Sequence, residues 1–241
     1  MPGRVVAAIS VLPLFAAFAV REHDPAAPGR GIDRPSIMAF LRRPEARRVL
    51  WIALIFRASE GLVKAMEGPY LVDAGIPLDV IGYLSGMGAA AAGIAGAAVA
   101  ALLLKRWGVG ATLGLLGSLR TLCFLIFAVH ALGIAGGVWP LFGASVLQTL
   151  IRYMEIVALF SLFMSVTSSS QPGTDFTILA CAQLIVYLVG SSLSGVLADL
   201  LGYGALFSLS TVLSGIAVAG AMMLLNRAPQ TPEQLGSATR S

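Results

Sequence analysis

Four charged side chains stand at helical spacing within one apolar stretch of the chain. The stretch Leu50–Leu71 is long enough to cross a bilayer, because about 20 residues rising 1.5 Å each span the roughly 30 Å hydrocarbon layer. The charged residues in it are Arg57, Glu60, Lys64 and Glu67. At about 100° per residue they fall within an arc of roughly 80°. Their i,i+3 and i,i+4 spacing predicts that neighbours along this stripe pair with one another.

The energetics of charge in lipid predict where this stripe faces. Each charge costs about 2.5–3.5 kcal/mol at a bilayer centre, whereas each Leu or Ile returns only a few tenths. The stripe is therefore expected to face a protein interior or a water-filled cavity. Two interpretations follow: a translocation or proton-coupling pathway, or a ladder of ion pairs that only locks helices together. We favour the pathway, because ionisable residues inside membranes have a functional role more often than a purely structural one.

Polar residues also recur on one face of the apolar segment Val138–Val166. Gln148, Arg152 and Glu155 lie within about 60° of one another by the same helical arithmetic. Arg120 stands alone near the middle of the preceding segment. An arginine at that depth needs a carboxylate partner, and Glu155 and Glu60 are the two candidates.

A third polar face is predicted on the segment Phe176–Leu201, where Gln183 and Tyr187 either line a cavity or bridge two helices. Asp175, just before this segment, is expected to cap its first turn. The candidate residues of a substrate or proton pathway are then Arg57, Glu60, Lys64, Glu67, Arg120, Gln148, Arg152, Glu155, Gln183 and Tyr187.

The chemistry available to this set is transport and not catalysis. A carboxylate beside an arginine stays ionised, and it takes up a proton when the arginine moves away. Buried arginines suit an anionic substrate, because the guanidinium fork matches a carboxylate. The sequence holds no nucleophile–base arrangement and no phosphate-binding loop, and Cys123, Cys181, His23 and His130 lack metal-site spacing. We therefore expect no enzyme activity, no cofactor and no metal.

Composition excludes an ordinary soluble domain. The 241 residues are 57% apolar and only 12% charged. This balance is typical of helical membrane proteins. The net charge of +4 gathers near segment ends, so it indicates membrane orientation, and no nucleic-acid partner is expected.

Hydropathy predicts an all-α, polytopic transmembrane helix bundle of about seven helices. The apolar segments are Val5–Val20, Leu50–Leu71, Val80–Leu104, Val109–Leu132, Val138–Val166, Phe176–Leu201 and Gly204–Leu225. The first segment is short and also resembles a signal peptide. We interpret it as a helix, because the basic residues that follow it would lie outside the cell after signal cleavage.

Four regions are thus expected. Residues 1–20 form a transmembrane helix, residues 21–49 a basic cytoplasmic loop, residues 50–225 a six-helix unit, and residues 226–241 a disordered cytoplasmic tail. Within the six-helix unit, Val80–Leu104 carries small residues four apart, such as Gly82 and Gly86, which predicts close packing of this helix against another.

Several of these stretches resemble the major facilitator superfamily of transporters. The resemblance is carried by the basic loop before a charged helix, by Leu103–Gly108 and by Gly195–Tyr203. More narrowly, Phe56–Gly61, Gly173–Thr177 and Ala182-Gln183 are similar to stretches in the RhtX/FptX-type siderophore permeases and in the related muropeptide and acetyl-coenzyme A transporters.

Members of this superfamily have twelve helices in two six-helix halves. The resemblance covers the last helix of the amino-terminal half and the whole carboxy-terminal half, which implies a truncated reading frame, a mis-called start or half of a split transporter. It implies import of a ferri-siderophore or similar anionic solute across the inner membrane, by proton coupling or by facilitated diffusion. A muropeptide permease, a drug exporter, a seven-helix receptor and a nonfunctional remnant are the alternatives.

Overall fold

The first two helices of the described structure are a short one and a long one. Both overlap the region that the sequence analysis predicts as a loop. The computed structural model describes residues 36–168 and 170–226. Helix α2 (Ile37–Arg42) is capped by the Ser36 hydroxyl, which accepts a hydrogen bond from the Ala39 N–H. Helix α3 (Pro44–Asp73) begins with proline at its first position, where the missing N–H costs nothing.

The expected loop 21–49 is therefore wrong in its second part. Its residues from Ile37 onward lie in α2 and in the first turns of α3. The reason is packing, because Phe40, Ala46 and Val49 are buried in one apolar cluster with the middle of α3. The predicted helix 1–20, the loop up to residue 35 and the tail from residue 227 lie outside the described residues.

Helix α4 (Leu78–Tyr83), the π-helical turn η1 (Leu84–Gly88) and helix α5 (Ala89–Ala131) follow one another without a break. Helix α6 (Val138–Val166) and helix α7 (Pro172–Asn226) complete the described chain. The described elements are all helical, which confirms the predicted all-α class.

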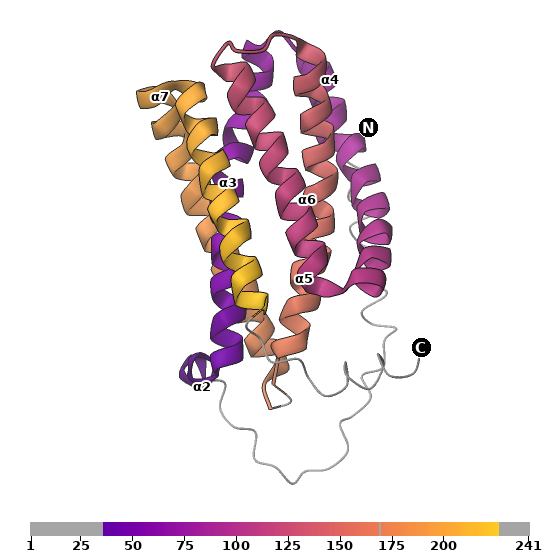
Figure 1. The fold of residues 1–241 in the computed structure, drawn as a ribbon, viewed down its shortest axis with the longest axis vertical. Coiled ribbons are helices and arrows are strands. Elements are labelled where there is room, and N and C mark those ends of the chain that lie inside the picture. Colours follow the sequence, from indigo (N-terminus) through magenta and orange to yellow (C-terminus); the bar gives the residue numbers. More distant parts are fainter. Residues whose placement is uncertain (1–35, 169, 227–241) are drawn as a thin grey trace, which may run out of the picture. The chain divides into compact units, whose positions relative to one another are not determined.

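Two glycines reverse the direction of the longest helices. Gly108 has φ 76° and ψ 173° within α5, and Gly202 has φ 78° and ψ 165° within α7. Positive φ suits glycine, because it has no Cβ to clash. Straight helices of 43 and 55 residues would extend about 65 Å and 82 Å, far beyond a bilayer. Figure 1 shows α5 and α7 each folding back on itself.

Within the described residues, three helical stretches are long and apolar enough to cross a membrane: Leu78–Ala131, Val138–Val166 and Pro172–Leu225. They are compatible with a membrane protein. Helix α3 is not among them, since its centre carries four ionisable side chains. The predicted count of about seven helices is not confirmed. Segments that were predicted as separate helices on either side of Gly108 and of Gly202 belong to one element each, α5 and α7, and the first predicted segment lies outside the described residues.

The described helices bury two apolar clusters of side chains. The first cluster includes Val63, Phe124 and Phe207, and the second includes Phe40, Phe56 and Phe163. Helix α3 packs mainly against α7, and α5 packs against α6 and α7 (Figure 1).

The Val80–Leu104 segment does pack closely against another helix, but not at Gly82 and Gly86. Gly82 and Gly86 have open surroundings. Close approach occurs instead at Gly96, where an added Cβ would lie 3.2 Å from the Tyr153 Cβ and 3.4 Å from the Leu150 carbonyl oxygen on α6. Several positions of this segment satisfy the same four-residue spacing, and only the rotation of the helix decides which face packs.

Candidate functional site

Glu60 of α3 is shared by two arginines from two helices. Its side chain is 2% exposed, and one of its oxygens accepts a hydrogen bond from Arg57, one turn earlier on α3. The other oxygen lies 3.0 Å from the Nε of Arg152 on α6, without the alignment of a hydrogen bond. The three side chains form a group with two positive charges and one negative charge, which we call the Glu60 triad.

The ring of Tyr187 on α7 covers this triad. The guanidinium carbons of Arg57 and Arg152 lie 5.8 Å and 5.5 Å from the centre of that ring, within the range of cation–π attraction. The backbones of α3 and α7 approach each other closely here because both helices carry glycine at the contact. An added Cβ on Gly61 would lie 2.5 Å from the Tyr187 carbonyl oxygen. Tyr187 therefore bridges three helices.

Arg120 of α5 and Glu155 of α6 form a second, deeper pair. Their side chains are 2% and 1% exposed, and the Nη1 of Arg120 donates to Glu155 at 2.9 Å. The guanidinium carbon also lies 4.6 Å from the centre of the Phe56 ring and 5.9 Å from that of Phe124. Of the two predicted partners for Arg120, the structure pairs it with Glu155, because Glu60 is already occupied by the arginines of the triad.

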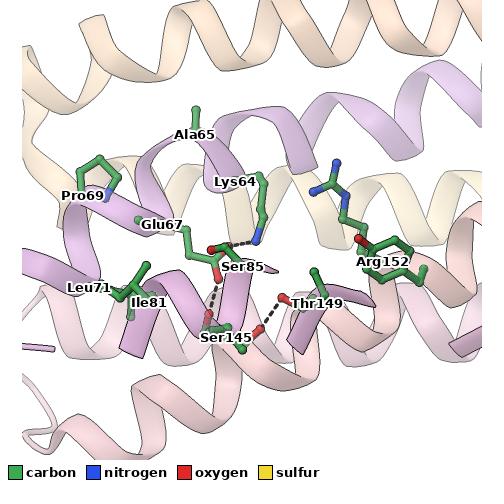
Figure 2. Close-up of a pocket in the computed structure, with 14 residues that line it drawn as sticks. Lys64, Ala65, Glu67, Pro69, Leu71, Ile81, Ser85, Ser145, Thr149 and Arg152 are labelled. Carbon is green, nitrogen blue, oxygen red and sulfur yellow. Dashed lines mark hydrogen bonds and ion pairs between the residues drawn. The ribbon is translucent and has the colours of Figure 1, made fainter. Parts of the chain in front are cut away.

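A third group, next to a cavity, joins Lys64, Glu67 and Ser145. The Lys64 Nζ lies 2.8 Å from one Glu67 oxygen, and the Ser145 hydroxyl on α6 donates to the other. These residues line a cavity of about 260 Å³. Figure 2 shows this hydrogen-bonded group on one side of the cavity and Arg152 at its far end.

Two irregular stretches of backbone form part of the cavity wall. Pro69 lies inside α3 and has no N–H, so it cannot bond the carbonyl of Ala65 one turn earlier, and both residues line the cavity. Leu84 and Ser85, also in the lining, belong to the π-helical turn η1. Such turns are found most often at functional sites.

The structure places eight of the ten predicted residues in three groups. Arg57, Glu60 and Arg152 form the triad beside the ring of Tyr187, Lys64 and Glu67 meet at the cavity, and Arg120 pairs with Glu155. The predicted pairs Arg57–Glu60 and Lys64–Glu67 are confirmed, whereas Glu60 forms no ion pair with Lys64 within the described part of the chain.

Gln148 and Gln183 are both buried, and their Oε1 atoms have no hydrogen-bond partner among the described residues. Their contribution to a pathway stays a prediction, as does the role of the other eight residues in transport.

Sequence reasoning missed four polar residues of the cavity lining: Ser85, Ser145, Thr149 and Tyr153. A signal was present for two of them, because Ser145 and Thr149 each precede a predicted residue of α6 by three positions and continue its polar face. For Ser85, on an exposed stretch of small residues, the sequence offers no such signal.

Asp175 does not cap the helix that contains it, contrary to the sequence-based interpretation. Its carboxylate accepts hydrogen bonds from the Ser168 N–H and hydroxyl at 2.8 Å each, from the Gln171 side-chain amide at 2.9 Å, and from Arg43. It lies in the first turn of α7 and points back toward the preceding residues, so it ties the α6–α7 connection to the start of α3.

No model of a known protein family matches the chain. Among residues 36–168 and 170–226, no group of three or more His, Cys, Asp or Glu side chains lies close enough to hold a metal ion. The site is therefore described by its charged groups and its cavity.

Proposed function

We propose that this protein is a secondary transporter of the major facilitator type, located in the plasma membrane. The single observation that carries the proposal is that ionisable side chains of three helices converge inside an apolar bundle, next to a cavity with polar walls. Charges in such a position are costly, and ionisable residues that are kept there commonly mark a substrate or ion pathway. The resemblance of Phe56–Gly61 and Gly173–Thr177 to siderophore permeases supports the same class.

Proton coupling would use the shared carboxylate of the Glu60 triad. Both arginines contact Glu60 in this arrangement. A movement of α6 against α3 would withdraw Arg152 and leave Arg57 as the remaining neighbour. The charge partners of Glu60 would then depend on the relative position of the two helices.

The proposed substrate is a ferri-siderophore or a similar anionic organic solute, imported into the cell. A muropeptide permease or a drug exporter of the same superfamily is the second candidate, because Gly173–Thr177 and Ala182-Gln183 resemble those relatives too. The resemblance also implies a second six-helix half, so we propose that the described helices form one wall of a larger transport pathway.

Uptake of labelled ferri-siderophore tests this function. Cells that express the complete gene are compared with a deletion strain and with cells that express the Glu60→Ala variant. We expect uptake only with the unchanged gene, at equal abundance of the protein in the membrane. Lys105→Ala is the matched control, since Lys105 is exposed and far along the chain from the triad. Equal uptake by the deletion strain would remove the siderophore assignment.

A further inference from the structure

Among the described residues, the charged side chains that meet between α3, α5 and α6 do not balance in sign. The positive ones are Arg57, Lys64, Arg120 and Arg152, and the negative ones are Glu60, Glu67 and Glu155. The Arg120–Glu155 and Lys64–Glu67 pairs are each neutral. The excess positive charge therefore belongs to the Glu60 triad, where one carboxylate faces two guanidinium groups.

Arg152 is the member of the triad that reaches the cavity. Its side chain is 30% exposed, compared with 11% for Arg57, and it lines the cavity wall. Only its Nε approaches Glu60, and no hydrogen bond from its two Nη atoms is found within the described part of the chain. Those two nitrogens are the fork with which arginine binds a carboxylate at two points.

Lys64 supplies further donors to the same cavity. Lys64 contributes three N–H groups, of which one is directed to Glu67 at 2.8 Å. Both oxygens of Glu67 are occupied, one by Lys64 and the other by Ser145, so this carboxylate is held away from Arg152. Figure 2 shows Lys64 and Arg152 on the same cavity, with no carboxylate drawn between them.

We propose that this cavity binds the carboxylate of a singly charged organic anion, held by the Nη atoms of Arg152 and by the free donors of Lys64. One negative charge would neutralise the excess of the triad and would accept hydrogen bonds from the Nη atoms of Arg152. This inference rests on the proposed transport function, since it names the charge class of the transported solute.

Three probes of almost the same shape test the charge preference. Benzoate, benzamide and benzamidinium carry one negative, no and one positive charge on the same ring. Their binding to the purified full chain, in bilayer discs of zwitterionic lipid, is measured by titration calorimetry. We expect benzoate to bind at least tenfold more tightly than benzamide, because its bonds to Arg152 are charge-assisted, and we expect no binding of benzamidinium.

Two variants at Arg152 test whether the cavity is the source of the preference for a negatively charged probe. Arg152→Gln should abolish the difference between benzoate and benzamide, while Arg152→Lys should keep part of it, because the charge remains and the two-point geometry is lost. Lys105→Gln, which removes an exposed cation outside the cavity, should change nothing. The melting temperature of each variant shows whether it is folded, and Arg152→Lys keeps the test valid if Arg152→Gln does not fold.

The proposal is overturned if benzoate does not bind, if all three probes bind equally, or if folded Arg152→Gln retains the preference. Its failure is distinguishable from failure of the transport proposal. Siderophore uptake without a benzoate preference would support the transport proposal and contradict the anion site. A benzoate preference that depends on Arg152, without uptake of any solute, would support the anion site and contradict the transport proposal.

Discussion

Replacing Arg120 by methionine would break the deepest ion pair of the bundle. The Arg120 side chain is 2% exposed, and it donates to Glu155 at 2.9 Å while its guanidinium lies over the Phe56 ring. Methionine fills a similar, unbranched space without the charge. The Arg120→Met variant therefore leaves Glu155, itself 1% exposed, as a buried carboxylate without its cation.

The expected cost is large. Removing one partner of a buried ion pair destabilises a protein by about 3–5 kcal/mol, because the remaining charge is left without compensation. At about 1.4 kcal/mol per factor of ten, this lowers the ratio of folded to unfolded protein by roughly one hundred to several thousand fold. Replacing both partners by methionine should cost far less, within about 1 kcal/mol of the unchanged protein, since no isolated charge remains.

Equilibrium unfolding in mixed detergent micelles measures these differences. The purified chain is titrated with sodium dodecyl sulfate, and loss of helix is followed by circular dichroism. Four proteins are compared: the unchanged chain, Arg120→Met, Glu155→Met, and the double variant. Arg106→Met serves as the control, because Arg106 is exposed, and we expect it to fall within about 0.5 kcal/mol of the unchanged chain.

Two outcomes would refute this reasoning. If Arg120→Met cost less than about 1 kcal/mol, the pair would not be sealed from solvent in the way that its exposed fractions indicate. If the double variant cost as much as the two single variants added together, Arg120 and Glu155 would act independently, and the contact between them would not be the source of the loss.

The other predictions concern the packing of α3 against α7 and the connection between α6 and α7. Gly61→Ala should destabilise the protein by about 1–3 kcal/mol in the same titration, because the new Cβ would lie 2.5 Å from a carbonyl oxygen of α7. Gly68→Ala, on the same helix with nothing within 4 Å, should not destabilise it, and equal losses in both would contradict the packing argument. Asp175→Asn should lower stability by about 1–3 kcal/mol, because it removes a carboxylate that accepts four hydrogen bonds. Asp199→Asn, at an exposed position, is the control, and a melting temperature equal to that of the control would contradict the role assigned to Asp175.

Sequence alone determined the features that depend on the helical repeat within one segment. Hydrophobic runs of about 20 residues without proline clusters favour helices, so the all-α class followed directly. The pairs Arg57–Glu60 and Lys64–Glu67 were predictable because residues three apart lie on one face of any helix. The inward direction of the stripe followed from the cost of charge in an apolar environment.

The tertiary structure decided every contact between helices. Arg120 pairs with Glu155, and Arg152 contacts Glu60, because of the rotation and sliding of α3, α5 and α6 against one another, which spacing within one segment does not encode. That rotation is set by close packing, as where Gly61 admits the backbone of α7 and brings the Tyr187 ring over two arginines. The cavity, and the surplus of positive charge beside it, exist only once these helices are packed together.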